Sequence, residues 1–235
     1  MNIEYEGWEL DDFDSAKNYR SYQFDLISRF IKGSTAEVGP GNGINIQYYY
    51  NQVDDLTLYE PTTKLFSILK RKYSDKNNIK IKNETFNNEH EKFDTIIYLD
   101  VLEHIKEDKK EFLNAYKKLN PEGHMIINVP AFNLLYSDFD RDVNHYKRYN
   151  KKDFINLLEG TNYNFLKLVY YDSIGFFLAL LSKYILKKNY KGNFKNKISF
   201  WNKLIPMSKF IDKITFHSVG KSLICIVKKW KIVNY

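Results

Sequence analysis

The sequence contains few of the residues that mark secreted or fibrous proteins. Among its 235 residues there are 10 glycines, 5 prolines and one cysteine, Cys225, which cannot form a disulfide within the chain. A disulfide scaffold is therefore excluded, and long disorder is excluded because 43% of the residues are hydrophobic and 17% are aromatic. No basic-then-apolar signal segment opens the chain, so we expect a reducing, cytoplasmic compartment.

Long hydrophobic runs are also absent. The longest apolar stretch, Ile174 to Leu181, is far shorter than the ~20 residues that a membrane-spanning helix needs. The sequence therefore predicts a protein that can touch a membrane but does not cross it.

Acidic side chains are scarce in the last quarter of the chain. Residues 1–173 carry 23 basic and 28 acidic side chains, whereas residues 174–235 carry 13 lysines and only Asp212. Such a basic section can meet phosphates, an anionic membrane face or an acidic acceptor, and a solvated lysine-rich face explains it equally well.

Strand and helix patterns alternate from Thr35 onward, which predicts an α/β fold. We expect a mostly parallel seven-stranded sheet with helices on both faces, and an inserted helical, basic segment before the last strand. The nearly continuous apolar run Phe93 to Leu99 is typical of a strand at the sheet centre. The apolar stretch from Ile44 to Tyr50 could open a helix. The predicted strands are 35–38, 56–60, 79–81, 93–99, 125–129, 165–171 and 222–228.

A glycine turn follows the first predicted strand. Residues 37–43 are Glu-Val-Gly-Pro-Gly-Asn-Gly, and such a turn lets a ligand approach the backbone closely. A dinucleotide fingerprint would need glycine where Ile44 stands, and no Lys-Ser or Lys-Thr follows the turn. The pattern therefore favours a ligand without a pyrophosphate.

Glu60 ends the second predicted strand, 17 residues after Gly43. A carboxylate at that point can accept hydrogen bonds from both hydroxyls of a ribose. Either feature alone is equally consistent with a tight turn or a helix cap, but together they indicate a nucleoside ligand.

These residues together resemble the class I S-adenosylmethionine-dependent methyltransferases. The glycine turn, Glu60, the strand 93–99, the Asp-Val-Leu-Glu-His-Ile segment at 100–105 and the Pro-Glu-Gly turn within 119–129 match that family's order and spacing. The resemblance covers residues 15–171. It implies a Rossmann-like methyltransferase fold and S-adenosyl-L-methionine as the cofactor.

The resemblance also implies roles for individual residues. The glycine turn would line the methionine moiety, Glu60 would hold the ribose, and Glu84 or Thr85 would lie by the adenine. Tyr19 could close over the cofactor. The implied cofactor-binding residues are Tyr19, Glu37, Gly39, Pro40, Gly41, Asn42, Gly43, Glu60, Pro61, Glu84, Thr85, Asp100, Val101 and Leu102.

Methyl transfer to a hydroxyl benefits from a positioned base, and histidine suits neutral pH. His104, after the central strand, and His145, in a later loop, are the candidates, and the resemblance implies that Asp100 lies near the transferring methyl. His104 could equally cap the next helix or hydrogen-bond within the cofactor pocket. The spacing of His90, His104, His124 and His145 matches no metal-ligand pattern, so we expect no metal site.

The loop from Tyr136 to Tyr149 is rich in polar and aromatic side chains and resembles a bacterial subgroup of these enzymes that acts on small molecules or glycans. The predicted acceptor-binding residues are Tyr136, Asp140, His145, Arg148 and Tyr149. The alternative is a self-satisfied network in which Asp140 or Asp142 pairs with Arg148.

We expect a single methyltransferase domain over residues 1–235. It would comprise an N-terminal helical lid (1–33), a cofactor-binding core (34–173), an inserted cap or surface segment (174–220), and the last strand and tail (221–235). The insertion combines apolar residues with lysines, so a membrane contact, a substrate cap and a dimer surface are all open.

The predicted function is methylation, on oxygen or nitrogen, of a small polar acceptor such as a sugar or a phosphorylated or lipid-linked glycan precursor. An RNA methyltransferase is the alternative, which the basic tail suggests. Its weakness is the missing Asn/Asp-Pro-Pro-aromatic motif, since the chain has only Asn128-Val-Pro130. A third possibility is a non-catalytic cofactor-binding partner protein. The sequence does not indicate the oligomeric state.

Overall fold

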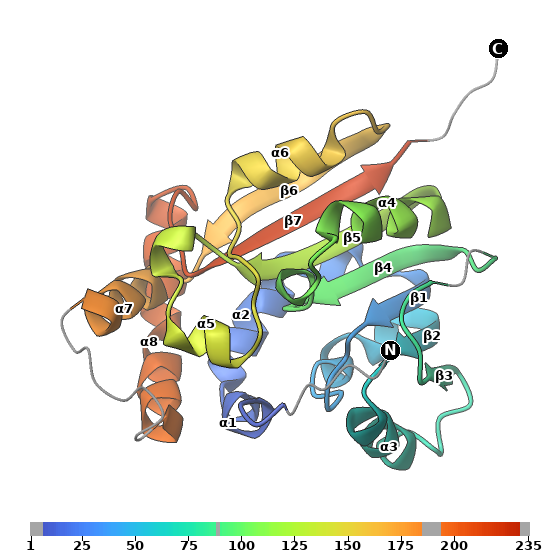
Figure 1. Ribbon diagram of the computed structural model, residues 1–235, viewed down its shortest axis with the longest axis horizontal. Coiled ribbons are helices and arrows are strands. Elements are labelled where there is room, and N and C mark those ends of the chain that lie inside the picture. The colour runs from blue at the N-terminus through green and yellow to red at the C-terminus, as the bar shows by residue number, and fades with distance from the viewer. Residues whose placement is uncertain (1–6, 88–89, 185–193, 231–235) are drawn as a thin grey trace.

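The computed structural model describes residues 7–87, 90–184 and 194–230, and its core is one seven-stranded sheet (Figure 1). The order across the sheet is β3-β2-β1-β4-β5-β7-β6, and β7 is antiparallel to both of its neighbours. The predicted fold class is therefore confirmed, with β4 at the centre. The strands are β1 (Gly33–Val38), β2 (Val53–Tyr59), β3 (Ile79–Lys82), β4 (Phe93–Leu99), β5 (Leu119–Pro130), β6 (Tyr163–Tyr171) and β7 (Ser222–Lys229).

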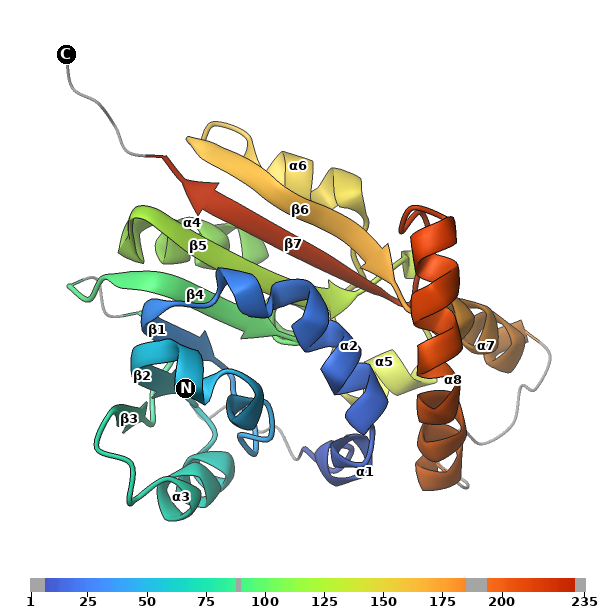
Figure 2. The same cartoon turned by 180° about the vertical axis from the view of Figure 1, so that it is seen from behind.

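Helices cover both faces of the sheet (Figures 1 and 2). One face packs against α4 and α6 through Phe112 and Phe154, and the other packs against α2, α3 and α8 through Phe24, Leu69 and Ile205. Double coverage explains why the central strands are almost wholly apolar. The helices are α1 (Leu10–Asp14), α2 (Lys17–Ile27), α3 (Thr63–Lys72), α4 (Asp108–Lys118), α5 (Asp138–Asp142), α6 (Lys151–Leu158), α7 (Ser173–Tyr184) and α8 (Phe194–Ile214).

The predicted insertion is largely helical and consists of α7 and α8. Ile198 and Trp201 of α8 are buried in the same hydrophobic cluster as α2. Buried Asp212 accepts a hydrogen bond from the Tyr22 hydroxyl at 2.9 Å, which ties α8 to α2. Residues 185–193 of the insertion, and 231–235 of the predicted tail, lie outside the described residues. Within the described residues, no helix combines the length and the apolar character needed to cross a membrane.

The helix considered at residues 44–50 is not formed. Two short 3-10 turns, Ile46–Tyr48 and Tyr50–Gln52, stand in its place. Consecutive tyrosines are held in different directions, because the Tyr49 hydroxyl donates to Glu37 and the Tyr50 hydroxyl donates to Asn78 at 2.5 Å. These tertiary contacts outweigh the local pattern.

The chain order reverses between β1 and β4. The strands β2 and β3 extend the sheet from β1 in one direction, and β5, β7 and β6 extend it from β4 in the other. In open α/β sheets, ligands bind in the crevice outside the carboxyl ends of the strands at such a switch point.

Candidate active site

A cleft of about 1930 Å³ includes the switch point and continues along α4 as far as Tyr116 and Thr161. Its lining includes Val38, Tyr59, Leu99 and Pro130, which end or nearly end β1, β2, β4 and β5. Sites for a single small molecule measure roughly 300 to 1,000 Å³. The cleft therefore has room for a nucleoside cofactor and a second ligand.

The glycine turn forms one wall of this cleft. Gly39 and Gly41 have φ angles of 64° and 60°, a left-handed conformation that other residues adopt at a cost. A Cβ on Gly39 would stand 2.8 Å from Cγ2 of Val101, so this position has no room for a side chain. Pro40 and Asn42 also line the cleft, whereas Gly43 packs against Leu69 of α3.

Glu60 joins the turn to the second strand. The residue is only 3% exposed, and its carboxylate accepts backbone hydrogen bonds from Gly41 at 3.2 Å and Thr62 at 2.9 Å. Burial raises the pKa of Glu60, and hydrogen bonds from the Thr62 backbone, the Thr62 side chain and the Gly41 backbone oppose that rise. A carboxylate offers about four lone-pair sites, so with three donors in place about one remains for a ribose hydroxyl. The donor set and the turn without side chains both fit a nucleoside.

Two predicted cofactor residues lie away from the cleft lining. Glu37 is buried beneath the turn, and burial raises its pKa to about 7 although the Tyr49 hydroxyl donates to it. Glu84 is exposed, with its carboxylate 3.9 Å from the Lys82 ammonium.

Other predicted cofactor residues do line the cleft. They are Thr85, Tyr19, Pro61, Asp100 and Val101. Leu102 is buried behind it.

Asp100 ends a chain of hydrogen bonds that begins on α2. The Tyr171 hydroxyl lies 2.7 Å from the Tyr19 hydroxyl and 2.9 Å from Asn128 Oδ1, and Asn128 Nδ2 donates to Asp100 at 2.8 Å. Because an amide oxygen can only accept, Tyr171 gives its single proton to Asn128 and accepts from Tyr19. Asp100, with a φ of 58°, is thereby held at the cleft in a strained conformation.

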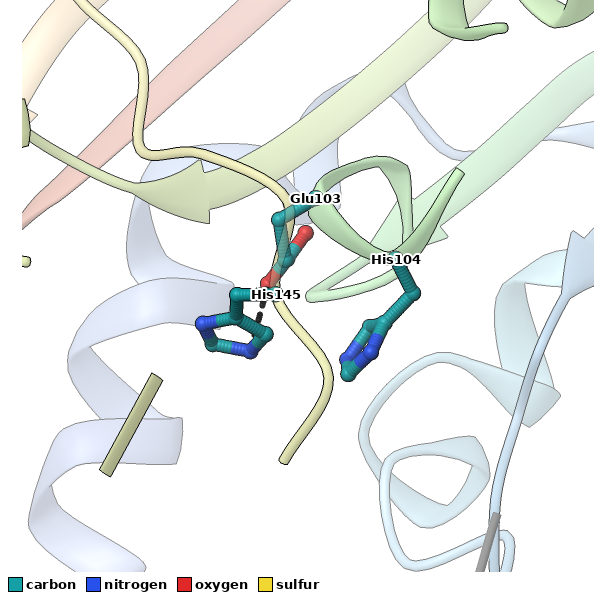
Figure 3. Close-up of side chains that lie close together, drawn as sticks. All are labelled: Glu103, His104 and His145. Atoms are coloured by element: carbon teal, nitrogen blue, oxygen red, sulfur yellow. Dashed lines mark ion pairs between the residues drawn. The ribbon is translucent and has the colours of Figure 1, made fainter. Parts of the chain in front are cut away.

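The opposite wall brings together Glu103, His104 and His145 (Figure 3). The ring centroids of the two histidines are 4.6 Å apart, and His145 Nε2 lies 3.8 Å from Glu103 Oε1. Burial lowers the pKa of His104 to about 3, so this ring is neutral at pH 7. Both predicted histidine bases therefore line the cleft near Asp100.

Asp140 is the buried centre of the acceptor loop. It accepts hydrogen bonds from Arg148 Nε at 2.8 Å and Nη2 at 3.0 Å, and its Oδ1 lies 2.8 Å from His145 Nδ1. Although burial opposes it, the hydrogen bonds from His145 and Arg148 lower the pKa of Asp140 to about 2. The pairing of Asp140 with Arg148, one of the two alternatives from the sequence, is present.

The loop divides into residues that face the cleft and residues that support them. His145 and Arg148 line the cleft. The Tyr136 hydroxyl donates to the His145 carbonyl at 2.7 Å, and the Tyr149 hydroxyl lies 2.9 Å from Asp108 Oδ2. Tyr136, Asp140 and Tyr149 therefore lie behind the lining and position it.

Sequence reasoning missed several lining residues. Glu103 directly precedes His104 in the segment 100–105, so the candidate role of His104 could have indicated Glu103 as a lining residue. Lys221 and Trp201 gave no local signal, because the last strand and the insertion bring them to the cleft, with the Lys221 ammonium 4.0 Å from the Trp201 ring centroid. Phe86 and Asn87, after Thr85, were also missed.

Comparison with known proteins agrees with this geometry. The profile of a family described as "Methyltransferase domain" matches residues 16–168. No curated protein sequence matches the chain.

Solved structures share the fold at low sequence identity. The N-methyltransferase NodS from Bradyrhizobium japonicum, in complex with S-adenosyl-L-homocysteine, is 13% identical over 95% of this chain and 92% of its own, with a TM-score of 0.60. An S-adenosylmethionine-dependent methyltransferase from Clostridium acetobutylicum is 14% identical, covering 92% of both chains, with a TM-score of 0.58. The [4+2]-cyclase SpnF is 13% identical over 88% of this chain and 80% of its own, with a TM-score of 0.57. At this identity the likeness shows the fold alone.

Proposed function

Because the chain belongs to the methyltransferase-domain family, among the class I S-adenosylmethionine-dependent methyltransferases, we propose that it methylates a small polar acceptor on oxygen or nitrogen. The acceptor class is a sugar or a phosphorylated or lipid-linked glycan precursor. One observation carries the proposal: Glu60 above the glycine turn and the His104–His145 pair face the same cleft.

S-adenosylmethionine, when bound, would supply a sulfonium methyl group whose carbon an acceptor lone pair attacks in line with the breaking carbon–sulfur bond, with S-adenosyl-L-homocysteine as the leaving group. Glu60 would hold the ribose, the turn at Gly39 and Gly41 would line the methionine moiety, and Thr85 would lie by the adenine. The protein's remaining work is to align the acceptor, exclude water and receive its proton. His145, His104 and Asp100 are the candidate proton acceptors and positioning groups.

Cationic groups in the acceptor part of the cleft favour an acceptor with a phosphate or another anionic group. Lys221 lies beside Trp201, and Lys106 and Lys109 stand at the cleft margin. Arg148 contributes less, because two of its nitrogens are already bound to Asp140. An ammonium group in a partly enclosed site binds phosphate oxygens more strongly than one in water.

The test has two parts. Calorimetry with S-adenosyl-L-homocysteine should show saturable binding at one molecule per chain, and a by-product assay should show its release with nucleotide sugars or phosphorylated glycan intermediates. Turnover of RNA alone would replace the glycan proposal with the RNA alternative. Cofactor binding without turnover of either class would favour the non-catalytic alternative.

A peripheral contact with an anionic membrane completes the proposal. An outer stripe on α8, made of Phe200, Lys203, Met207, Phe210 and Ile214, repeats every three or four residues. Its four apolar members are 51 to 65% exposed. The one acidic residue of α8, Asp212, is buried, so the exposed charged residues of α8 are lysines, of which Lys209 pairs with Asp25 of α2. An exposed apolar stripe bordered by lysine suits an anionic headgroup layer, which would bring a lipid-linked acceptor to the cleft.

A further inference from the structure

Glu103 is a buried acid whose carboxylate has no hydrogen-bond donor among the residues that the structure describes. Its side chain is buried, and within the described residues neither of its two carboxylate oxygens has a hydrogen-bond partner. Burial, together with the charges of Asp100 and Asp140, raises the pKa of Glu103 well above its ordinary value. A buried acid without a donor therefore holds its proton, and it ionises only where a positive charge such as a cation compensates the carboxylate.

His145 presents a lone pair to that carboxylate. Its Nδ1 lies 2.8 Å from Asp140 Oδ1, and because an ionised carboxylate only accepts hydrogen bonds, Nδ1 carries the proton. Nε2 of the neutral ring is then an acceptor, and it lies 3.8 Å from Glu103 Oε1. Arg148 holds Asp140 through two further hydrogen bonds, so the ring orientation is fixed from behind.

His104 completes the group from the same short turn as Glu103. Because burial lowers the pKa of His104, its ring is neutral at pH 7, and neutral imidazole is the form that binds metals. One ring nitrogen of each histidine and one oxygen of Glu103 all lie within 4.8 Å of one another, and Figure 3 shows the three side chains converging. The Nε2 lone pair of His145, one ring nitrogen of His104 and the Glu103 carboxylate therefore lie close enough together for one cation to contact all three.

We infer that Glu103, His104 and His145 bind one divalent transition-metal ion such as Zn²⁺, Co²⁺ or Mn²⁺. In a tetrahedral zinc site with bonds of about 2.0 to 2.1 Å, neighbouring donor atoms lie about 3.4 Å apart. The 3.8 Å between His145 and Glu103 is a few tenths of an ångström wider, and the three donor atoms, all within 4.8 Å of one another, would draw closer on binding the ion. Two imidazoles favour a transition metal over Mg²⁺ or Ca²⁺. Metal-bound histidines commonly donate their other ring N–H to a carboxylate, and Asp140 is that carboxylate for His145.

The site also suggests a role, which rests on the proposed function. Three protein ligands leave at least one coordination position open, and these ligands line the cleft beside Asp100. An acceptor hydroxyl in that position would be held in place, and its pKa would fall. The metal would thus position the acceptor and not the cofactor.

The test uses the full chain without a histidine tag, first treated with EDTA and then dialysed. Titration with Co²⁺, followed by visible absorption, and with Zn²⁺, followed by calorimetry, should show one saturable site per chain. Glu103→Gln and His145→Asn should each weaken binding by at least about 10-fold, and Asp140→Asn by about 10- to 100-fold. The exposed His90 lies outside the site, so His90→Gln is the matched control and should bind like the parent.

Folding and cofactor binding are measured in parallel, by thermal unfolding and by calorimetry with S-adenosyl-L-homocysteine. Absence of saturable metal binding in the folded parent would overturn the site, as would equal binding by the parent and by a folded Glu103→Gln/His145→Asn variant. Metal binding by a parent that fails to bind S-adenosyl-L-homocysteine would keep the site and remove the proposed function. Turnover that EDTA leaves unchanged would overturn the acceptor role.

Discussion

The backbone N–H of Gly41 donates to the Glu60 carboxylate at 3.2 Å, so the two sequence features that indicate a nucleoside are bound to each other. In the proposed function the acid therefore has both a structural task and a ligand-binding task. It holds the turn in place from the end of β2, and its side chain lines the cleft. Substitutions at this position test both tasks.

Glu60→Gln should weaken the binding of S-adenosyl-L-homocysteine at least tenfold. Hydrogen bonds to a charged group contribute about 1.5 to 3 kcal/mol, and the variant removes the charge. Calorimetry measures the change. Asp54→Asn is the control, because Asp54 is exposed on the same strand at its opposite end. Equal losses in the two variants would contradict a direct role for Glu60.

Gly39→Ala should abolish measurable binding and destabilise the fold. The new Cβ would stand 2.8 Å from Val101, and the φ of 64° adds about 1 to 2 kcal/mol of strain for a residue with a side chain. Urea unfolding and calorimetry are the measurements. Adding Val101→Ala should relieve the contact but leave the backbone strain, so recovery should be partial. Unchanged binding and stability in Gly39→Ala would show that the turn differs from the one described.

Tyr171→Phe should destabilise the protein by about 1 to 3 kcal/mol, because it leaves buried Asn128 Oδ1 without a donor. Tyr19→Phe should cost less, since Tyr171 can still donate to Asn128. Urea unfolding compares the two. If the variants lost equal stability, the order of donors along the Tyr19–Tyr171–Asn128 chain would be wrong.

Neutral, buried His104 should make the stability of the protein depend on pH. Its folded pKa of about 3 lies below its ordinary value of 6.5, so the unfolded chain binds the proton more readily between these values. Stability therefore falls as the pH decreases below 6.5, by at most about 1.4 kcal/mol per unit. Glu37 opposes this, because its raised pKa makes the folded state lose stability as the pH rises from 4.5 toward 7.

The difference between the parent and His104→Gln separates the two contributions. Urea unfolding is measured between pH 4.5 and 7 in the presence of EDTA. As the pH falls, the free energy of unfolding should decrease less for His104→Gln than for the parent. Parallel curves for the two proteins would show that His104 is not kept neutral by burial.

The outer stripe on α8 should bind vesicles that contain phosphatidylserine. Phe210→Ser/Ile214→Ser should reduce sedimentation with such vesicles at least tenfold, because burying one large apolar side chain contributes about 1.5 to 3 kcal/mol. Phosphatidylcholine vesicles should bind the parent weakly. Ile155→Ser removes an exposed isoleucine from α6 and serves as the control. Equal sedimentation of the parent with phosphatidylserine and phosphatidylcholine vesicles would contradict the membrane proposal.

Local patterns determined much of this protein. The alternation of strands and helices, the buried run Phe93–Leu99 and the glycine turn followed by Glu60 each depend on neighbours in the sequence, so the sequence by itself indicated the sheet, its centre and the nucleoside side of the cleft. The left-handed φ angles at Gly39 and Gly41, and the position of Glu60 in the cleft lining, follow from short-range geometry.

Only the tertiary structure decided which distant side chains meet. The distance along the chain between His104 and His145 fits no metal-ligand spacing, yet the loop after β5 folds back and sets their rings 4.6 Å apart. Likewise, α8 and the start of β7 bring Trp201 and Lys221 to the cleft, and Asp140 is paired inward with Arg148. Chain folding sets these distances through packing of the whole core, a cooperative property that residue spacing does not encode.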